Sequence, residues 1–203
     1  WMVQKEWISL LEESRQNWLS SLHIGNYYFE IGEKELAIDH WNKSLEFDSS
    51  PWALRNLAIA QKDSGNLLAA LDLYEKAINK FAPELHDAFY EEYLQLLINS
   101  EKYEQLWKIY TETFANRVPS ERIDLAAAKA ALQLGHYQFL EQIFSRTFAQ
   151  IREGESTLVA IWFEYQAILA AQQLGVVVDD QIRKQVRQSA RPPKNIDFRM
   201  IEG

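Results

Sequence analysis

The stretch GNLLAALDLYEKAI, residues 65–78, has a close counterpart in GEKELAIDHWNKSL, residues 32–45, which stands 33 residues earlier. Both segments begin with glycine, carry alanine five residues later, and place a large aromatic residue four residues after that alanine. The aromatic residue recurs as Tyr110 and Phe144, after further steps of 36 and 34 residues. Two helices of about 12 to 16 residues with tight turns fill such a period, so the spacing predicts repeated helical hairpins.

Apolar residues within each copy recur at helical spacing and do not alternate. In residues 65–78 one face carries Leu68, Leu71, Tyr74, Ala77 and Ile78, and the other carries Asp72, Glu75 and Lys76. Turn signals bracket the helices. DSG at 63–65 ends one helix, while SSP at 49–51 and VPSE at 118–121 each offer a serine cap to the next. We therefore expect an all-α fold.

Small residues occupy the positions where paired helices must approach closely. Gly25, Ala58 and Ala128 share one position in the first helices of their copies. Ala37 and Ala70 are expected to face them from the second helices. A larger side chain there would force the helices apart, at a cost of about 1 to 3 kcal/mol.

These residues resemble the tetratricopeptide repeat family, whose pattern has a small residue and a tyrosine in the first helix and alanine, an aromatic residue and alanine in the second. The first copy supplies Ile24, Gly25, Tyr28, Gly32, Ala37 and Trp41, with Ser44 where alanine is usual. The second supplies Leu54, Leu57, Ala58, Gly65, Ala70, Tyr74 and Ala77, with Gln61 where tyrosine is usual. Later copies keep the size pattern through Leu94, Leu97, Leu106, Tyr110, Ala128, Ala131, Gly135, Leu140 and Phe144.

The resemblance implies a right-handed superhelical solenoid of helix-turn-helix repeats. Repeats are expected at about 17–50, 51–83, 84–118, 119–153 and 154–191, after a capping helix or the remnant of a preceding repeat at 1–16 and before an extended tail at 192–203. In the tail, Ile196, Phe198 and Met200 alternate with polar residues, so we expect one face of it to be buried.

Two segments are similar to a narrower group. IREGESTLVAIWFEYQ at 151–166 and PPKNIDFRM at 192–200 resemble the closing stretch of large bacterial proteins that join a sugar-enzyme-like β domain of unknown function to tetratricopeptide repeats. This resemblance implies that the chain is the C-terminal helical arm of such a protein. A chain that begins at Trp1 fits that expectation of a longer parent.

Composition argues against several classes of function. The 203 residues carry a net charge of -8, and their lysines and arginines are scattered, so nucleic acid is not an expected partner. No apolar run has the length of about 20 residues that a membrane-spanning helix needs, and we expect a cytoplasmic protein. Cysteine is absent, and no two of His23, His40, His86 and His136 have the i, i+4 spacing of a helical metal site, so we expect no metal, no cofactor and no catalysis.

Stacked first helices line the inner surface in this architecture, so the register predicts a concave groove. Its predicted partner-binding residues are Asn26, Phe29, Trp52, Arg55, Asn56, Ile59, Gln95 and Lys129. Such a mixed, partly aromatic groove suits an extended peptide, which predicts a protein-protein or interdomain interaction scaffold. Alternatives are an accessory arm of a carbohydrate-active multidomain enzyme, a peptide-sensing regulatory module, a homodimer contact, a solvated face, and a groove filled by the chain's own tail.

Overall fold

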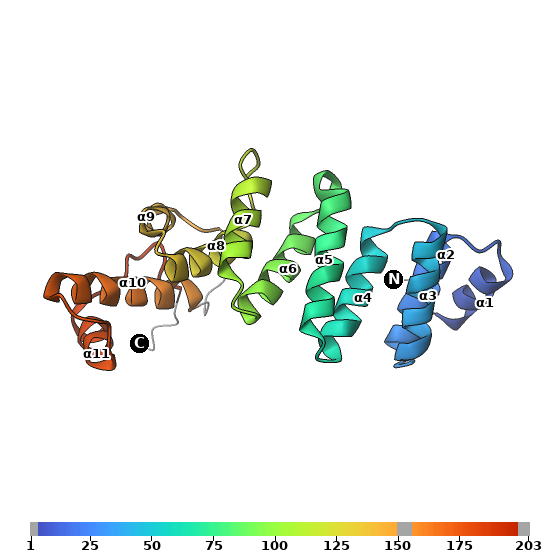
Figure 1. Ribbon diagram of the computed structural model, residues 1–203, viewed down its shortest axis with the longest axis horizontal. Coiled ribbons are helices and arrows are strands. Elements are labelled where there is room, and N and C mark those ends of the chain that lie inside the picture. The colour runs from blue at the N-terminus through green and yellow to red at the C-terminus, as the bar shows by residue number, and fades with distance from the viewer. Residues whose placement is uncertain (1–3, 150–155, 199–203) are drawn as a thin grey trace. The chain divides into compact units, whose positions relative to one another are not determined.

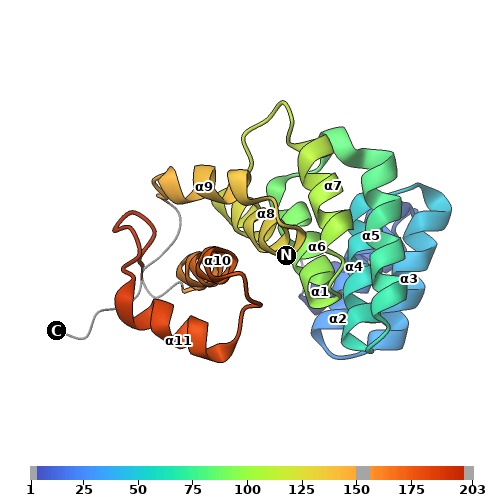
Figure 2. The same ribbon diagram turned by 60° about the vertical axis from the view of Figure 1, so that its left-hand side comes forward.

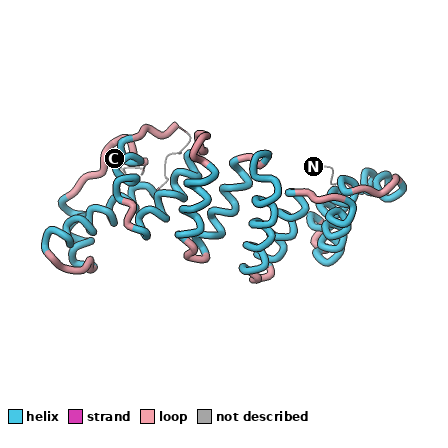
Figure 3. Tube along the Cα trace, turned by 45° about the horizontal axis from the view of Figure 1, so that its top comes forward, coloured by secondary structure: helices cyan, strands magenta, loops and turns pink. Residues whose placement is uncertain are grey.

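The computed structural model describes residues 4–149 and 156–198 (Figure 1). These residues form eleven α-helices and one short 3-10 helix, and no strand occurs among them (Figure 3). The expected all-α class is therefore confirmed. Within the same ranges, no helix combines the length and the apolar character that crossing a membrane would require.

The chain divides into two compact units, residues 1–89 and residues 90–203, which are called the N-terminal and the C-terminal unit below. The N-terminal unit contains α1 (Lys5–Glu13), α2 (Trp18–Glu30), α3 (Lys34–Phe47), α4 (Pro51–Asp63), α5 (Leu67–Phe81), the 3-10 helix η1 (Ala82–Glu84) and the start of α6 (Asp87–Asn99). Helix α2 packs against α3, α3 against α4, and α4 against α5. Successive helices are thus neighbours in space.

Local capping explains where these helices begin. Asn17 accepts hydrogen bonds from the backbone N–H groups of Leu19 and Ser20, and the Ser20 hydroxyl accepts one from the Asn17 N–H in return. Ser50 caps α4 ahead of Pro51, as the serine-proline signal predicts. The turn after α4 passes through Gly65 with φ of 80°, a left-handed conformation that favours glycine.

The expected close approach of α2 and α3 occurs at Gly25. A Cβ atom placed on Gly25 would lie 2.6 Å from Cδ1 and Nε1 of Trp41 and 3.0 Å from the carbonyl oxygen of Ala37. Trp41 is only 2% exposed. The departure at Ser44 is also explained, because its buried hydroxyl donates a hydrogen bond of 2.6 Å to the carbonyl oxygen of Trp18 and so joins the same two helices.

Helix α1 leaves much of its apolar surface exposed. In α1, Ile8 is 4% exposed, whereas Trp7 and Leu10 are 47% and 59% exposed. The Tyr28 hydroxyl of α2 donates to the Glu12 carboxylate at 3.3 Å, which ties the end of α1 to the hairpin behind it. Helix α1 therefore has one fully buried apolar side chain, Ile8, and a partly buried one, Leu11, beside this polar link.

The C-terminal unit holds the rest of α6 and five further helices. They are α7 (Tyr103–Thr113), α8 (Glu121–Leu134), α9 (Tyr137–Ser145), α10 (Thr157–Leu174) and α11 (Asp180–Ser189). Helix α8 packs against α7, α9 and α10, and α11 packs against α10 (Figure 2). Ser120 caps α8, as the VPSE signal predicts. Gly135 and Gly175 end α8 and α10 in the left-handed conformation.

A buried carboxylate links three parts of this unit. Asp124, in the first turn of α8, is fully buried. It accepts a hydrogen bond of 2.8 Å from the Tyr110 hydroxyl of α7 and one of 2.6 Å from the Arg146 guanidinium, which follows α9. Burial, and then the hydrogen bond to Asp124, raises the pKa of Tyr110 well above its ordinary value.

The segment after α11 packs back onto its own unit. Ile196 is fully buried, and Phe198 lies edge-on to Phe148 with their ring centroids 6.5 Å apart. The Asn195 amide donates to the carbonyl oxygens of Phe144 and Arg146 at 2.9 and 2.7 Å. The chain turns at residues 194–196, and residues 199–203, including the expected tail residue Met200, lie outside the described part.

The Gly25 contact predicts an unusual response to alanine. Gly25→Ala would ordinarily stabilise a helix by about 1 kcal/mol. Here we expect it to lower the free energy of unfolding by about 1 to 3 kcal/mol, because the new methyl group meets the Trp41 ring. Urea denaturation followed by circular dichroism measures this. The control is Asn42→Ala at an exposed site of α3. Equal or higher stability of Gly25→Ala would contradict the contact.

The Asp124 cluster predicts an asymmetry between its partners. Arg146→Met should cost about 3 to 5 kcal/mol, because a fully buried carboxylate loses its cation. Asp124→Asn should cost less, because the amide oxygen of asparagine can still accept a hydrogen bond from Tyr110. The Arg146 side chain is 41% exposed, so its charge can be solvated by water. Urea denaturation of both variants tests the order, and the reverse order would show that Arg146 does not compensate the buried charge.

Candidate binding pocket

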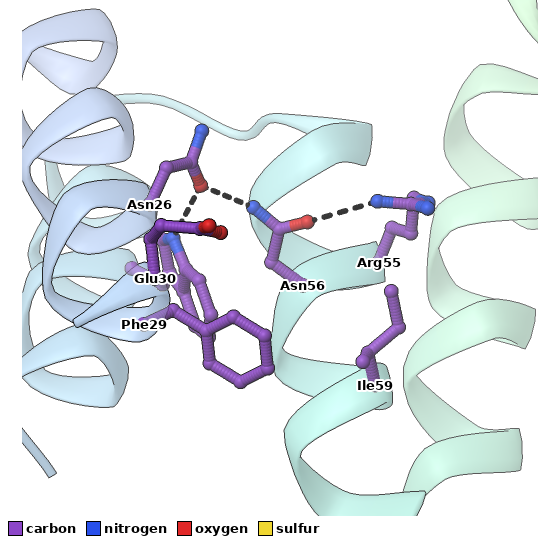
Figure 4. Close-up of a pocket in the computed structure, with 7 residues that line it drawn as sticks. Asn26, Phe29, Glu30, Arg55, Asn56 and Ile59 are labelled. Carbon is purple, nitrogen blue, oxygen red and sulfur yellow. Dashed lines mark hydrogen bonds between the residues drawn. The ribbon is translucent and has the colours of Figure 1, made fainter. Parts of the chain in front are cut away.

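A pocket of about 490 Å³ opens in the N-terminal unit between α2 and α4, with α3 behind it (Figure 4). Its lining residues are Asn26, Phe29 and Glu30 from α2, Trp41 from α3, and Arg55, Asn56 and Ile59 from α4. On both α2 and α4 the lining positions are spaced by three and four residues. Residues at that spacing share one helical face, so two parallel stripes of side chains form the walls.

The polar wall is a chain of three hydrogen bonds. The Trp41 indole N–H donates to Asn26 Oδ1 at 3.0 Å, and the Asn56 amide donates to the same oxygen at 2.7 Å. The Arg55 guanidinium donates to Asn56 Oδ1 at 3.2 Å. These three hydrogen bonds therefore connect α3, α2 and α4, and Figure 4 shows Asn26 and Asn56 next to each other in the middle of the series.

The direction of these bonds follows from the residues at the two ends. Indole and guanidinium groups are donors only, so each requires an amide oxygen opposite it. Asn26 must then turn its oxygen toward Trp41, and Asn56 must turn its oxygen toward Arg55. Asn56 is left with its NH₂ group facing Asn26, whose oxygen has a second lone pair to accept it. Asparagine orientation, usually ambiguous, is thus fixed by chemistry.

The rest of the lining is apolar or charged. The Phe29 ring lies 5.4 Å from the Trp41 ring between centroids, and Ile59 stands on the α4 side. Glu30 is exposed, whereas Arg55 is half-buried. The pocket can therefore accept an apolar group against Phe29 and Ile59 while polar atoms and both signs of charge are present nearby.

The lining offers little for catalysis. It includes one carboxylate, Glu30, and its other six residues supply no hydroxyl, thiol, imidazole or amine. A nucleophile with an adjacent base is the usual requirement for acyl or glycosyl transfer, and this lining does not provide that pair. Across residues 4–149 and 156–198, no group of three or more histidine and acidic side chains is placed to hold a metal ion.

The structure brings together five of the eight predicted groove residues. Asn26, Phe29, Arg55, Asn56 and Ile59 all line the pocket. Their partner-binding role stays a prediction.

The other three predicted residues lie elsewhere. Trp52 is 41% exposed and lies one turn before Arg55 and Asn56 on α4, outside the lining. Gln95 is on α6 and donates to Asn99 at 2.9 Å. Lys129 is half-buried on α8. Gln95 and Lys129 belong to the C-terminal unit.

Two lining residues are missed by the sequence argument. Trp41 holds the aromatic position of the sequence pattern and is buried, and its N–H also orients Asn26. A buried tryptophan needs an acceptor, which was an available signal. Glu30 lies four residues after Asn26 on the same face of α2, so the helical register alone could have found it.

Comparison with known proteins adds no relative. The chain matches no protein-family model, and no curated protein matches it.

The polar wall predicts how Asn26 responds to substitution. Asn26→Leu removes the oxygen that accepts from Trp41 and Asn56, so we expect a loss of about 1 to 3 kcal/mol in the free energy of unfolding. Asn26→Asp keeps an acceptor oxygen and should lose less. Urea denaturation measures both, with Asn79→Ala at an exposed site of α5 as control. If the leucine variant were as stable as the aspartate variant, the shared acceptor would not matter.

Proposed function

We propose that the chain is a protein-interaction scaffold without catalysis of its own, and that its pocket binds an extended peptide segment of a protein partner. One observation carries the proposal. Five residues predicted as groove positions, from the first helices of two successive hairpins, line one open pocket with a fixed polar wall and an apolar wall. A pre-formed site of this kind loses little entropy when an extended segment enters it.

The proposal extends to the architecture. The helix pairs α2–α3 and α4–α5 repeat the same small and aromatic positions, and Gly25 and Trp41 make the close contact that the tetratricopeptide pattern requires. We therefore propose tetratricopeptide-like repeats arranged as a right-handed solenoid. The sequence resemblance of residues 151–166 and 192–200 supports a role as the helical arm of a larger bacterial protein, and a cytoplasmic location is proposed with it.

A peptide suits the pocket better than a small polar metabolite. The apolar lining of Phe29 and Ile59 favours one bulky side chain of the ligand. The two amides and Arg55 are already bonded to one another, so they present a rigid polar surface and do not converge on a single compact anion. Affinity would then depend on a few aromatic and arginine anchors.

Selection from a displayed library of random nonapeptides tests the proposal. We expect the wild-type chain to enrich a consensus with one large apolar residue. Ile59→Arg places a long charged side chain at the pocket wall and should weaken binding of that consensus at least about tenfold. Leu68→Arg makes the same type of change on α5, where Leu68 is 73% exposed, and should bind like the wild type.

Circular dichroism spectra of both variants confirm that folding is retained. The proposal is wrong if no consensus is enriched, or if Ile59→Arg and the wild type bind the same peptides equally well. Turnover of a substrate by the isolated chain would remove the scaffold assignment.

A further inference from the structure

Charge is divided unevenly along the chain. Residues 183–194 contain five lysines and arginines and no carboxylate, so their net charge is +5. This leaves -13 for the rest of a chain whose net charge is -8. The otherwise scattered cations thus have one local concentration, and it coincides with α11 and the residues that follow it.

The cations of α11 lie away from its buried side. Ile182 and Val186 are each 8% exposed and pack with the apolar residues of α10. At about 100° per residue, Lys184 falls on the far side of the helix and Arg187 lies to one side of it. Both are exposed, as is Arg191 just beyond the helix end. Lys184, Arg187 and Arg191 are called the basic face below.

The basic face has no acidic partner among the described residues. Lys184 and Arg187 form no ion pair there, and Arg191 donates only to backbone carbonyl oxygens at the end of α11. Arg183 differs, because it binds Glu164 at 2.9 Å and Asp180 at 3.1 Å. Asp180 is one of two exposed aspartates at the start of α11, and the other, Asp179, caps the helix.

Helix α3 carries the complementary surface. Its buried side contains Ala37, Trp41 and Ser44. The same rotation per residue places Glu35, Asp39 and Glu46 directly opposite, and all three are exposed without an ion pair in the described part of the chain. These three carboxylates are called the acidic face below. Lys43 lies to one side of it.

Exposed apolar residues lie beside the acidic face on α3 and ahead of α11 in the chain. Leu36 and Phe47 are 43% and 55% exposed and lie on one side of the acidic face of α3. Leu174, the last residue of α10, is 67% exposed, and Val177, in the loop before α11, is 87% exposed. Exposed ion pairs each contribute little, so this apolar surface provides the area that charge alone would not.

We propose that copies of this chain associate with one another, the basic face of α11 in one copy meeting the acidic face of α3 in another. The complementary surface is present in the chain itself, which favours a second copy over another anion. A membrane is less suited, because the apolar side of α11 is already covered by α10. The contact joins two different surfaces, so it is of the heterologous kind.

Sedimentation velocity over a range of protein concentrations tests this inference. We expect species heavier than 23.7 kDa at about 50 mM salt and dissociation, with at least a tenfold weaker constant, at about 500 mM. The variants Lys184→Glu/Arg187→Glu and Glu35→Lys/Asp39→Lys should each be monomeric. Mixing them should restore a mixed complex, because the two faces have exchanged charge.

Two controls separate this contact from general charge effects. Lys5→Glu/Lys108→Glu makes the same change in net charge at exposed sites of α1 and α7 and should associate like the wild type. Lys184→Gln/Arg187→Gln removes the charges without reversing them and should weaken association. A monomer at every concentration, association that the α11 and α3 variants leave unchanged, or failure of the mixture to associate would each overturn the proposal. None of these outcomes depends on the peptide pocket.

Discussion

The burial of the Trp41 indole between α2 and α3 is the constraint on which the N-terminal unit depends. A large ring can lie there only if the facing helix has no side chain at that point, and Gly25 provides the gap. The same ring edge carries an N–H that is excluded from water and therefore needs an acceptor, which Asn26 supplies. Two adjacent residues of α2 thus accommodate Trp41, because Gly25 leaves space for the ring and Asn26 accepts its N–H.

Those two contacts also produce the pocket. Once Asn26 is oriented by Trp41, its oxygen accepts from Asn56, and Asn56 in turn accepts from Arg55. Hydrogen bonds at the pocket wall in this way connect the packed hairpin of α2 and α3 to α4, the first helix of the next hairpin. The pocket residues are consequently part of the structure's support, and these hydrogen bonds fix their positions.

Much of the fold follows from the sequence, because its signals are local. The serine caps at Ser50 and Ser120 and the glycine at Gly65 mark helix ends independently of tertiary context. The pocket is only partly predictable, since register identifies Asn26 and Asn56 as facing residues but not their bond to each other. Trp52 shows the limit of the argument. Trp52 shares a face of α4 with Arg55 and Asn56, yet the pocket ends one turn before it. How far the pocket extends along α4 depends on side-chain packing, which the periodicity of the sequence does not encode.

The two units meet the same requirement with different chemistry. The aromatic position of the repeat pattern holds Trp41 in the first unit and Tyr110 in the second. The Trp41 ring is buried and the Tyr110 ring half-buried, and each has a polar atom that needs a partner. Trp41 finds a neutral amide in its own hairpin, whereas Tyr110 donates to Asp124 of the following helix. A buried carboxylate requires a cation, so Arg146 is recruited from beyond α9, and Asn195 binds the carbonyl of Arg146. The choice of tyrosine at one position therefore leads, contact by contact, to the docking of the residues that follow α11.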